Sequence, residues 1–165
     1  MEDKKIKLQI WDMTPNEKYK NIISSYYNKV HGIMLVYDIS NKQSFKDLYY
    51  YLIEIEKSNQ NLTKLLIGNK INLNKEREVT YEEGKKFAEY YGMNFIEVCP
   101  KTSENINEAF EILVKEILQN ENEKKKNNIE IMEKGTKEND KNEKMEENLK
   151  FKLRKKIKIK KCVIF

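Results

Sequence analysis

The run Gly32-Ile33-Met34-Leu35-Val36-Tyr37-Asp38-Ile39 decides the fold, because it is an almost unbroken apolar stretch with the length of a strand. Residues 64–68 form a second run of this kind, and residues 94–98 are a further candidate. Short continuous apolar runs are typical of strands covered on both faces, as in parallel sheets. Near the start, the period-two alternation of a half-buried strand is carried by Ile6, Leu8 and Ile10.

Helices are predicted between these strands from apolar residues three and four positions apart. The first helix carries Phe45, Leu48, Leu52 and Ile55, and the last carries Ile106, Ala109, Phe110, Leu113 and Ile117. Between them, Thr80 and Glu83 have the spacing of a capping box, and Gly92 is placed to end that helix. Strands that alternate with helices predict an α/β domain with a mostly parallel sheet and flanking helices.

The composition is too polar for a chain that is folded throughout. Of the 165 residues, 39% are hydrophobic and 36% are charged, and the mean hydropathy is -0.84. The helical rhythm stops near residue 120, so we expect a domain at residues 1–119 and a charged, disordered linker at residues 120–149. The two cysteines, Cys99 and Cys162, exclude a disulfide scaffold and a four-cysteine zinc site, and they suit a reducing compartment.

The end of the sequence is strongly basic. Residues 150–165 hold eight basic and no acidic side chains, which leaves 24 positive and 27 negative charges elsewhere. A slight excess of negative charge argues against nucleic-acid binding by residues 1–149. A negatively charged partner is therefore expected to bind the tail. A nuclear-import or nucleic-acid patch is the alternative interpretation of the tail. No apolar run approaches the length needed to cross a bilayer.

Five short blocks follow one another in an order that is more specific than any block alone. They are Ile10-Trp11-Asp12 with Glu17, Ser25-Tyr26-Tyr27, residues 32–38, Gly68-Asn69-Lys70 and residues 97–101. Taken singly, Trp11-Asp12 fits a core tryptophan with a capping aspartate, and Asn69-Lys70 fits a plain turn. Taken together, residues 5–119 resemble the small GTPases of the Rab family. The resemblance implies a small-GTPase fold, GTP or GDP as the ligand, and Mg²⁺ as the metal.

The resemblance assigns roles near the first strand. Asp12 is implied to bind Mg²⁺ through a water molecule, and Asn16 holds the place of the residue that orients the attacking water. Asn16 is one methylene shorter than the family's glutamine, so its catalytic role is weakened. Pro15 stands where the family has a glycine whose backbone N–H contacts the γ-phosphate, and proline has no N–H to donate.

The resemblance also implies a site for the nucleotide base. Its residues are Asn69, Lys70, Asn72, Cys99, Pro100 and Lys101. Asn72 replaces an aspartate that accepts from two donors of guanine. An amide offers one acceptor and a competing donor, so discrimination for guanine is expected to fall. Pro100 replaces a residue whose backbone N–H contacts the base.

The family's glycine-rich phosphate loop has no counterpart before Lys5. We therefore expect an incomplete P-loop fold whose sheet lacks its middle strand. A first exon missing from the gene model explains this as well as a short protein does.

Cys162-Val163-Ile164-Phe165 has the form of a prenylation signal, and a final Phe favours a geranylgeranyl group on Cys162. The basic residues before it supply a second attraction, to an anionic cytoplasmic leaflet. We expect residues 150–165 to be a polybasic, prenylated tail. The resemblance adds prenylation enzymes, Rab escort proteins and effectors as partners, and Golgi or secretory vesicles as the location.

Two functions follow from these patterns. The first is a Rab-type GTPase that binds and hydrolyses GTP in vesicle transport, which requires a further amino-terminal part. The second is a nucleotide-free, membrane-tethered relative that binds partner proteins. The first function is the main hypothesis, and the features that discriminate the second from it are the replacements at Pro15, Asn72 and Pro100 and the missing phosphate loop.

Overall fold

The computed structural model describes residues 6–13, 27–135 and 162–164, and one parallel sheet runs through them. Its strands are β1 (Ile10–Asp12), β2 (Gly32–Asp38), β3 (Thr63–Asn69), β4 (Asn94–Val98) and β5 (Cys162–Ile164). Their order across the sheet is β1-β5-β2-β3-β4, and every neighbouring pair is parallel. The predicted α/β class with a parallel sheet is confirmed.

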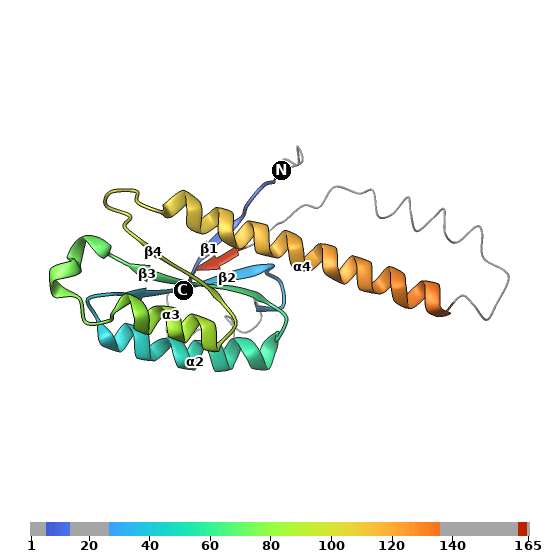
Figure 1. Cartoon of the computed structure of the whole chain (residues 1–165), viewed down its shortest axis with the longest axis horizontal. Coiled ribbons are helices and arrows are strands. Elements are labelled where there is room, and N and C mark those ends of the chain that lie inside the picture. Colours follow the sequence, from blue (N-terminus) through green and yellow to red (C-terminus); the bar gives the residue numbers. More distant parts are fainter. Residues whose placement is uncertain (1–5, 14–26, 136–161, 165) are drawn as a thin grey trace.

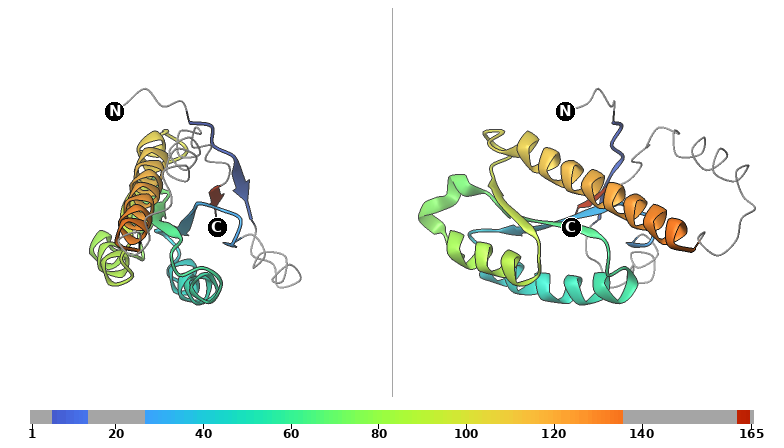
Figure 2. Two further views of the ribbon diagram at one scale, coloured as in Figure 1. Left: turned by 90° about the vertical axis from the view of Figure 1, so that its right-hand side faces the viewer. Right: turned by 45° about the vertical axis from the view of Figure 1, so that its right-hand side comes forward.

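Helices cover both faces of this sheet (Figure 1). They are α2 (Lys42–Ser58), α3 (Tyr81–Tyr90) and α4 (Ile106–Gly135), and a short 3-10 segment, η2 (Ile71–Glu76), follows β3. Figure 2 shows α4 on one face of the sheet and α2 with α3 on the other. Three layers of this kind leave the central strands buried on both sides, which is why their sequences are apolar throughout.

Each face of the sheet has its own apolar core. Successive residues of β2 point to opposite faces, so Ile33 and Leu35 join the core under α2 and α3, while Met34 joins the core under α4. The α2 side chains in the first core are Leu48, Leu52 and Ile55, and the α4 side chains in the second are Ala109, Leu113 and Ile117. The apolar spacing in the sequence predicted both sets.

The helix ends follow local chemistry. The side chain of Asn41 accepts hydrogen bonds from the backbone N–H groups of Gln43 and Ser44 at the start of α2. Thr80 and Glu83 form the predicted capping box of α3. Gly92 follows α3 with a φ of 62°, a left-handed conformation that favours glycine.

The last helix runs past residue 119, where the sequence predicts the end of the domain, and α4 continues to Gly135. Residues 120–135 are rich in Glu and Lys, which are good helix formers, and contain no proline. Asn120 Nδ2 also donates to Thr63 Oγ1 at 2.9 Å and ties this part of α4 to β3. The remainder of the expected linker, residues 136–149, and residues 150–161 of the tail lie outside the described residues. None of the helices in the described part of the chain is long and apolar enough to span a membrane.

The sheet differs from expectation on its amino-terminal side. β1 begins at Ile10 because its partner β5 pairs with only three of its residues, while Ile6 and Leu8 pack against the core under α4. The gap expected in the middle of the sheet is occupied in part by β5, which lies between β1 and β2 and pairs with Gly32–Met34 (Figures 1 and 2). Cys162 is the first residue of this strand.

Candidate functional site

Polar side chains gather at the edge of the sheet where β2, β3 and β4 end. The strand register aligns Asp38 with Asn69, and Asn69 with Val98, so these three ends lie side by side. In open α/β sheets, ligands bind in the crevice outside the carboxyl ends of the strands. This edge is therefore the candidate site.

Asp38 and Lys70 form an ion pair across the ends of β2 and β3. Lys70 Nζ lies 2.7 Å from Asp38 Oδ2, and the side-chain and backbone groups of Ser40 donate to Asp38 Oδ1 at 2.7 and 2.9 Å. Burial alone would raise the pKa of Asp38, but the hydrogen bonds from Lys70 and Ser40 outweigh it and hold the pKa below its usual value. The carboxylate is charged at neutral pH and positions the Lys70 ammonium at the edge.

Asn69 and Lys70 also shape the turn that leaves β3. Lys70 has a φ of 69°, in the left-handed region, and its N–H donates to Asn69 Oδ1 at 2.7 Å. Side chains that hydrogen-bond their own turn stabilise such conformations in asparagine-containing loops. The turn starts η2, which carries Asn72 toward the end of β4.

Asn72 meets Cys99 at the end of β4. The Cys99 thiol donates to Asn72 Oδ1 across 3.1 Å, and Cys99 is fully buried. A side-chain hydrogen bond with Thr102 and nearby backbone N–H groups hold the pKa of the Cys99 thiol below its usual value. The thiol occupies one acceptor position of the Asn72 amide oxygen, which leaves that oxygen a second acceptor position for a ligand.

The residues after Cys99 form a closed loop. Cys99 and Glu104 exchange two backbone hydrogen bonds of 3.1 Å each, which bring the two ends of residues 99–104 together. Asn105 has a φ of 59°, and its side-chain NH₂ donates to the Glu97 carbonyl at 2.8 Å. Pro100 and Lys101 therefore sit in a loop that is held at both ends beside Asn72.

Asp12 ends β1, but β1 stops short of the edge that the ends of β2, β3 and β4 form. The register through β5 places Asp12 level with Met34, four residues before Asp38, or roughly 13 Å back along the strand. Among the described residues, no three acidic, cysteine or histidine side chains gather where they could hold a metal ion. The described residues do not make a magnesium site by themselves, and Asp12 remains a predicted ligand. Pro15 and Asn16 lie outside the described residues.

The structure thus brings together most of the base-site residues that the sequence predicted, and it separates Asp12 from them. Two residues were missed. Asp38, the partner of Lys70, was detectable as the carboxylate that ends the longest apolar run, whereas Asn105 had no local signal. Asn105 donates a hydrogen bond to a backbone carbonyl of β4, and only folding brings these two groups together.

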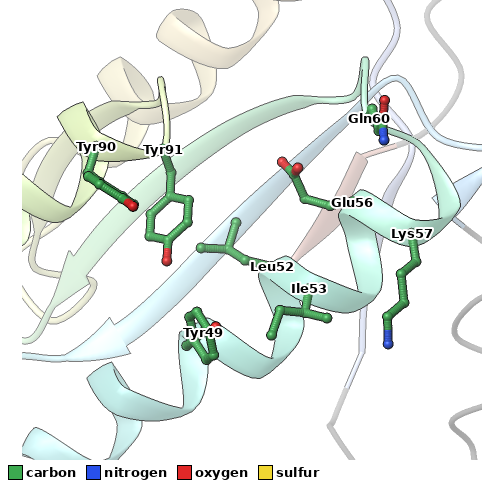
Figure 3. A pocket seen from close by; sticks show the side chains of 8 residues that line it. All are labelled: Tyr49, Leu52, Ile53, Glu56, Lys57, Gln60, Tyr90 and Tyr91. Atoms are coloured by element: carbon green, nitrogen blue, oxygen red, sulfur yellow. The ribbon is translucent and has the colours of Figure 1, made fainter.

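A second hollow lies away from this edge, between α2 and α3 (Figure 3). It encloses about 500 Å³ and is lined by Tyr49, Leu52, Ile53, Glu56, Lys57, Gln60, Tyr90 and Tyr91. Tyr49 is half exposed and Tyr90 is 82% exposed.

Comparison with known proteins gives the relatives of the chain. A family model described as Ras family matches residues 1–119. The chain is 40% identical to "Ras-related protein Rab-8B" of Homo sapiens over 125 residues, which are 75% of this chain and 60% of that protein. It is 36% identical to "GTP-binding protein ypt2" of Schizosaccharomyces pombe over 138 residues, 79% of this chain and 69% of that protein. "Ras-related protein RIC1" of Oryza sativa subsp. japonica matches at 43% over 115 residues, 69% of this chain and 57% of that protein.

The chain therefore belongs to the Ras family and, within it, to the Rab small GTPases. It spans about 60% of the length of the Rab-8B proteins that it matches. The relatives give no support to the nucleotide-free alternative.

Proposed function

We propose that this protein binds GTP and GDP as a Rab-type small GTPase and acts in vesicle transport. The observation that carries the proposal is the cluster of Asn69, Lys70, Asn72 and the loop at residues 99–104 at the carboxyl edge of a Ras-family sheet. Amide, ammonium and backbone groups at such an edge can bind the polar rim of a purine base.

The described residues fit the base end of a nucleotide better than its phosphate end. Asn69 and Lys70 are held by their own turn and by Asp38, so they need little reordering when a ligand arrives. Hydrolysis would further require Asn16 to orient the attacking water, with Mg²⁺ bound to the nucleotide neutralising charge on the phosphates. Because the described residues do not form a site for this metal, the proposal rests on the base end of the site alone.

Changing Asn72 to Asp is expected to raise the affinity for GDP by about tenfold, because a carboxylate accepts from both donors of the guanine edge. The gain should shrink for inosine diphosphate, whose base lacks the 2-amino donor. Both affinities can be measured by displacement of a fluorescent nucleotide from the full chain. Asn61→Asp, the same change in the loop between α2 and β3, is the control. Unchanged GDP affinity in Asn72→Asp would contradict the assigned base site.

We also propose that Cys162 carries a geranylgeranyl group that holds the protein on the cytoplasmic face of Golgi or secretory membranes. The support is the Cys162-Val163-Ile164-Phe165 pattern, the basic residues before it, and membership of the Rab group. Prenylation enzymes, Rab escort proteins and effectors are the proposed partners.

Cys162→Ser is expected to reduce the membrane-bound fraction of the protein at least about tenfold, because each buried CH₂ of a lipid chain contributes about 0.8 kcal/mol. The fraction is measured by sedimenting membranes from cells that express the full chain. Cys99→Ser is the matched control and should stay on the membrane. Equal sedimentation of Cys162→Ser and the unchanged chain would refute the lipid anchor.

A further inference from the structure

The hollow between α2 and α3 has walls of tyrosine. Tyr90 and Tyr91 lie at the carboxyl end of α3, and Tyr49 lies across from them on α2 (Figure 3). The rings of Tyr90 and Tyr91 are 4.9 Å apart between centroids and stand at 83° to one another, so they form two perpendicular surfaces. Leu52 and Ile53 add apolar surface from α2. The hollow therefore offers aromatic faces and an apolar wall to a ligand.

A carboxylate lies close to these rings. Glu56 lines the hollow, and its side chain is half exposed. Burial raises the pKa of the Tyr91 hydroxyl. The oxygens of Tyr49, Tyr90 and Glu56 raise it further, because a second negative charge beside them is unfavourable. Aromatic faces are also negative in potential, so the rings and the carboxylate together favour a positively charged ligand.

The ammonium groups of Lys57 and Lys64 do not occupy the hollow. Lys57 Nζ lies 3.3 Å from Glu54 Oε1, and this side chain extends away from the tyrosines (Figure 3). Lys64 has a largely buried side chain on β3, and its Nζ donates to Glu56 Oε1 at 2.8 Å. The other oxygen of that carboxylate, Glu56 Oε2, can accept a hydrogen bond from a ligand.

We propose that this hollow binds an arginine side chain of a protein partner. The guanidinium stacks on Tyr90 or Tyr91 and donates to Glu56 Oε2, and its methylene stem packs on Leu52 and Ile53. Arginine suits these groups because its guanidinium is planar, weakly hydrated and rich in N–H donors, whereas the lysine ammonium is compact and strongly hydrated. A quaternary ammonium has no N–H and would leave the carboxylate without a hydrogen bond.

The surface around the hollow favours a protein as the source of the arginine. Tyr49 and Tyr90 are exposed, and so is Tyr50, whose ring centroid is 6.2 Å from that of Tyr49. Tyrosine and arginine are both enriched at the buried centres of protein interfaces. A partner that inserts an arginine into the hollow would cover these rings.

The requirement for a guanidinium is tested by NMR titration of the full chain with acetyl-glycyl-arginyl-glycinamide, read at the tyrosine ring signals. The citrulline peptide has nearly the same shape without the charge, and the trimethyl-lysine peptide has the charge without N–H donors. The arginine peptide should bind at least about threefold more tightly than either. Equal affinities for the arginine and citrulline peptides would overturn the proposal. Tighter binding of the trimethyl-lysine peptide, or rings of Tyr49, Tyr90 and Tyr91 that do not shift, would overturn it too.

The position of the site is tested with Tyr90→Leu, which keeps an apolar side chain but removes the aromatic face. Tyr90 is exposed, so the core should stay folded, and unchanged amide signals in β2 and β3 would confirm this. The affinity for the arginine peptide should fall at least about threefold. Tyr50→Leu, the same change at an exposed tyrosine outside the hollow, is the matched control and should keep its affinity. Equal losses in the two variants would place the peptide elsewhere and overturn the proposal.

The role of the carboxylate is tested with Glu56→Gln, which removes the charge and keeps an acceptor for Lys64. The arginine peptide should again bind at least about threefold more weakly. Glu111→Gln removes the same charge from α4, on the opposite face of the sheet, and should leave the affinity unchanged (Figure 2). An affinity that falls equally in both variants would show that only the overall charge of the protein matters, which would overturn the proposed contact.

Discussion

Replacing Arg77 by Met is expected to lower the free energy of unfolding by about 3 kcal/mol, because it leaves the Glu97 carboxylate without its partner in a largely buried position. Two hydrogen bonds join the pair, Arg77 Nη1 to Glu97 Oε1 at 2.6 Å and Arg77 Nη2 to Glu97 Oε2 at 2.9 Å. The side chains are only 19% and 12% exposed. The hydrogen bonds that Arg77 donates to Glu97 also raise the pKa of Arg77, so its guanidinium stays charged.

Urea unfolding of the full chain measures this loss. Lys42→Met is the comparison, because it breaks the Lys42–Glu83 ion pair, whose side chains are 38% and 42% exposed. It should cost less than about 1 kcal/mol. In the double variant Arg77→Met/Glu97→Leu, the buried charge is gone and most of the stability should return. A loss in Arg77→Met no larger than that in Lys42→Met would contradict this account.

Gly84→Ala is expected to destabilise the protein by about 1–3 kcal/mol, although alanine is the better helix former. A Cβ at Gly84 would lie 2.4 Å from the Tyr37 hydroxyl and 2.7 Å from Phe95 Cζ. Tyr37 is 1% exposed and packs edge-on against Phe45 with ring centroids 4.8 Å apart, so its ring has little room to withdraw. Steric overlap therefore outweighs helix propensity at this position.

Measuring Gly84→Ala in a Tyr37→Phe background separates the effect of steric overlap with the Tyr37 hydroxyl from the effect of the substitution on the backbone. The Tyr37 hydroxyl is buried and has no hydrogen-bond partner in the described part of the chain, so its removal should cost little. Gly84→Ala should then destabilise the Tyr37→Phe protein less than it destabilises the unchanged protein. Thermal unfolding measures both losses. Gly92→Ala is the control, because a Cβ at Gly92 would meet no atom within 4 Å but would have to adopt a φ of 62°. Its cost comes from the backbone and should be the same in both backgrounds. Equal penalties for Gly84→Ala in both backgrounds would show that the hydroxyl contact is not the cause.

The central elements of the fold could be predicted because local sequence determines them. The apolar runs of β2 and β3, the helical spacing of Leu48 and Leu52, and the Thr80 capping box each follow from neighbouring residues. Such features do not depend on which other segment comes to lie beside them.

The errors occurred where long-range contacts decide the structure. The extent of β1 depends on a strand about 150 residues away in sequence, and no pattern near Ile10 indicates where that pairing starts. The continuation of α4 past Asn120 depends on its contact with Thr63 as well as on helix propensity. Glu and Lys are common in disordered segments and in exposed helices alike, so composition alone does not predict where α4 ends.

In the candidate site, too, local sequence motifs could be predicted and long-range contacts could not. Family motifs predicted Asn69, Lys70, Asn72 and Cys99, and the structure adds the ion pair with Asp38 and the thiol contact that orients Asn72. Contacts between residues of different strands arise only when the sheet forms. The sequence therefore indicated which residues to expect, but not that the Cys99 thiol contacts the Asn72 amide.

The most direct test of the central claim is an NMR titration of the full chain with GDP and Mg²⁺, with ADP as the comparison. We predict that the amides of residues 69–72 and 99–105 shift with GDP, and that they shift less with ADP. Absence of GDP-dependent shifts at these residues, or shifts confined to the hollow between α2 and α3, would contradict a nucleotide site at the carboxyl edge of the sheet.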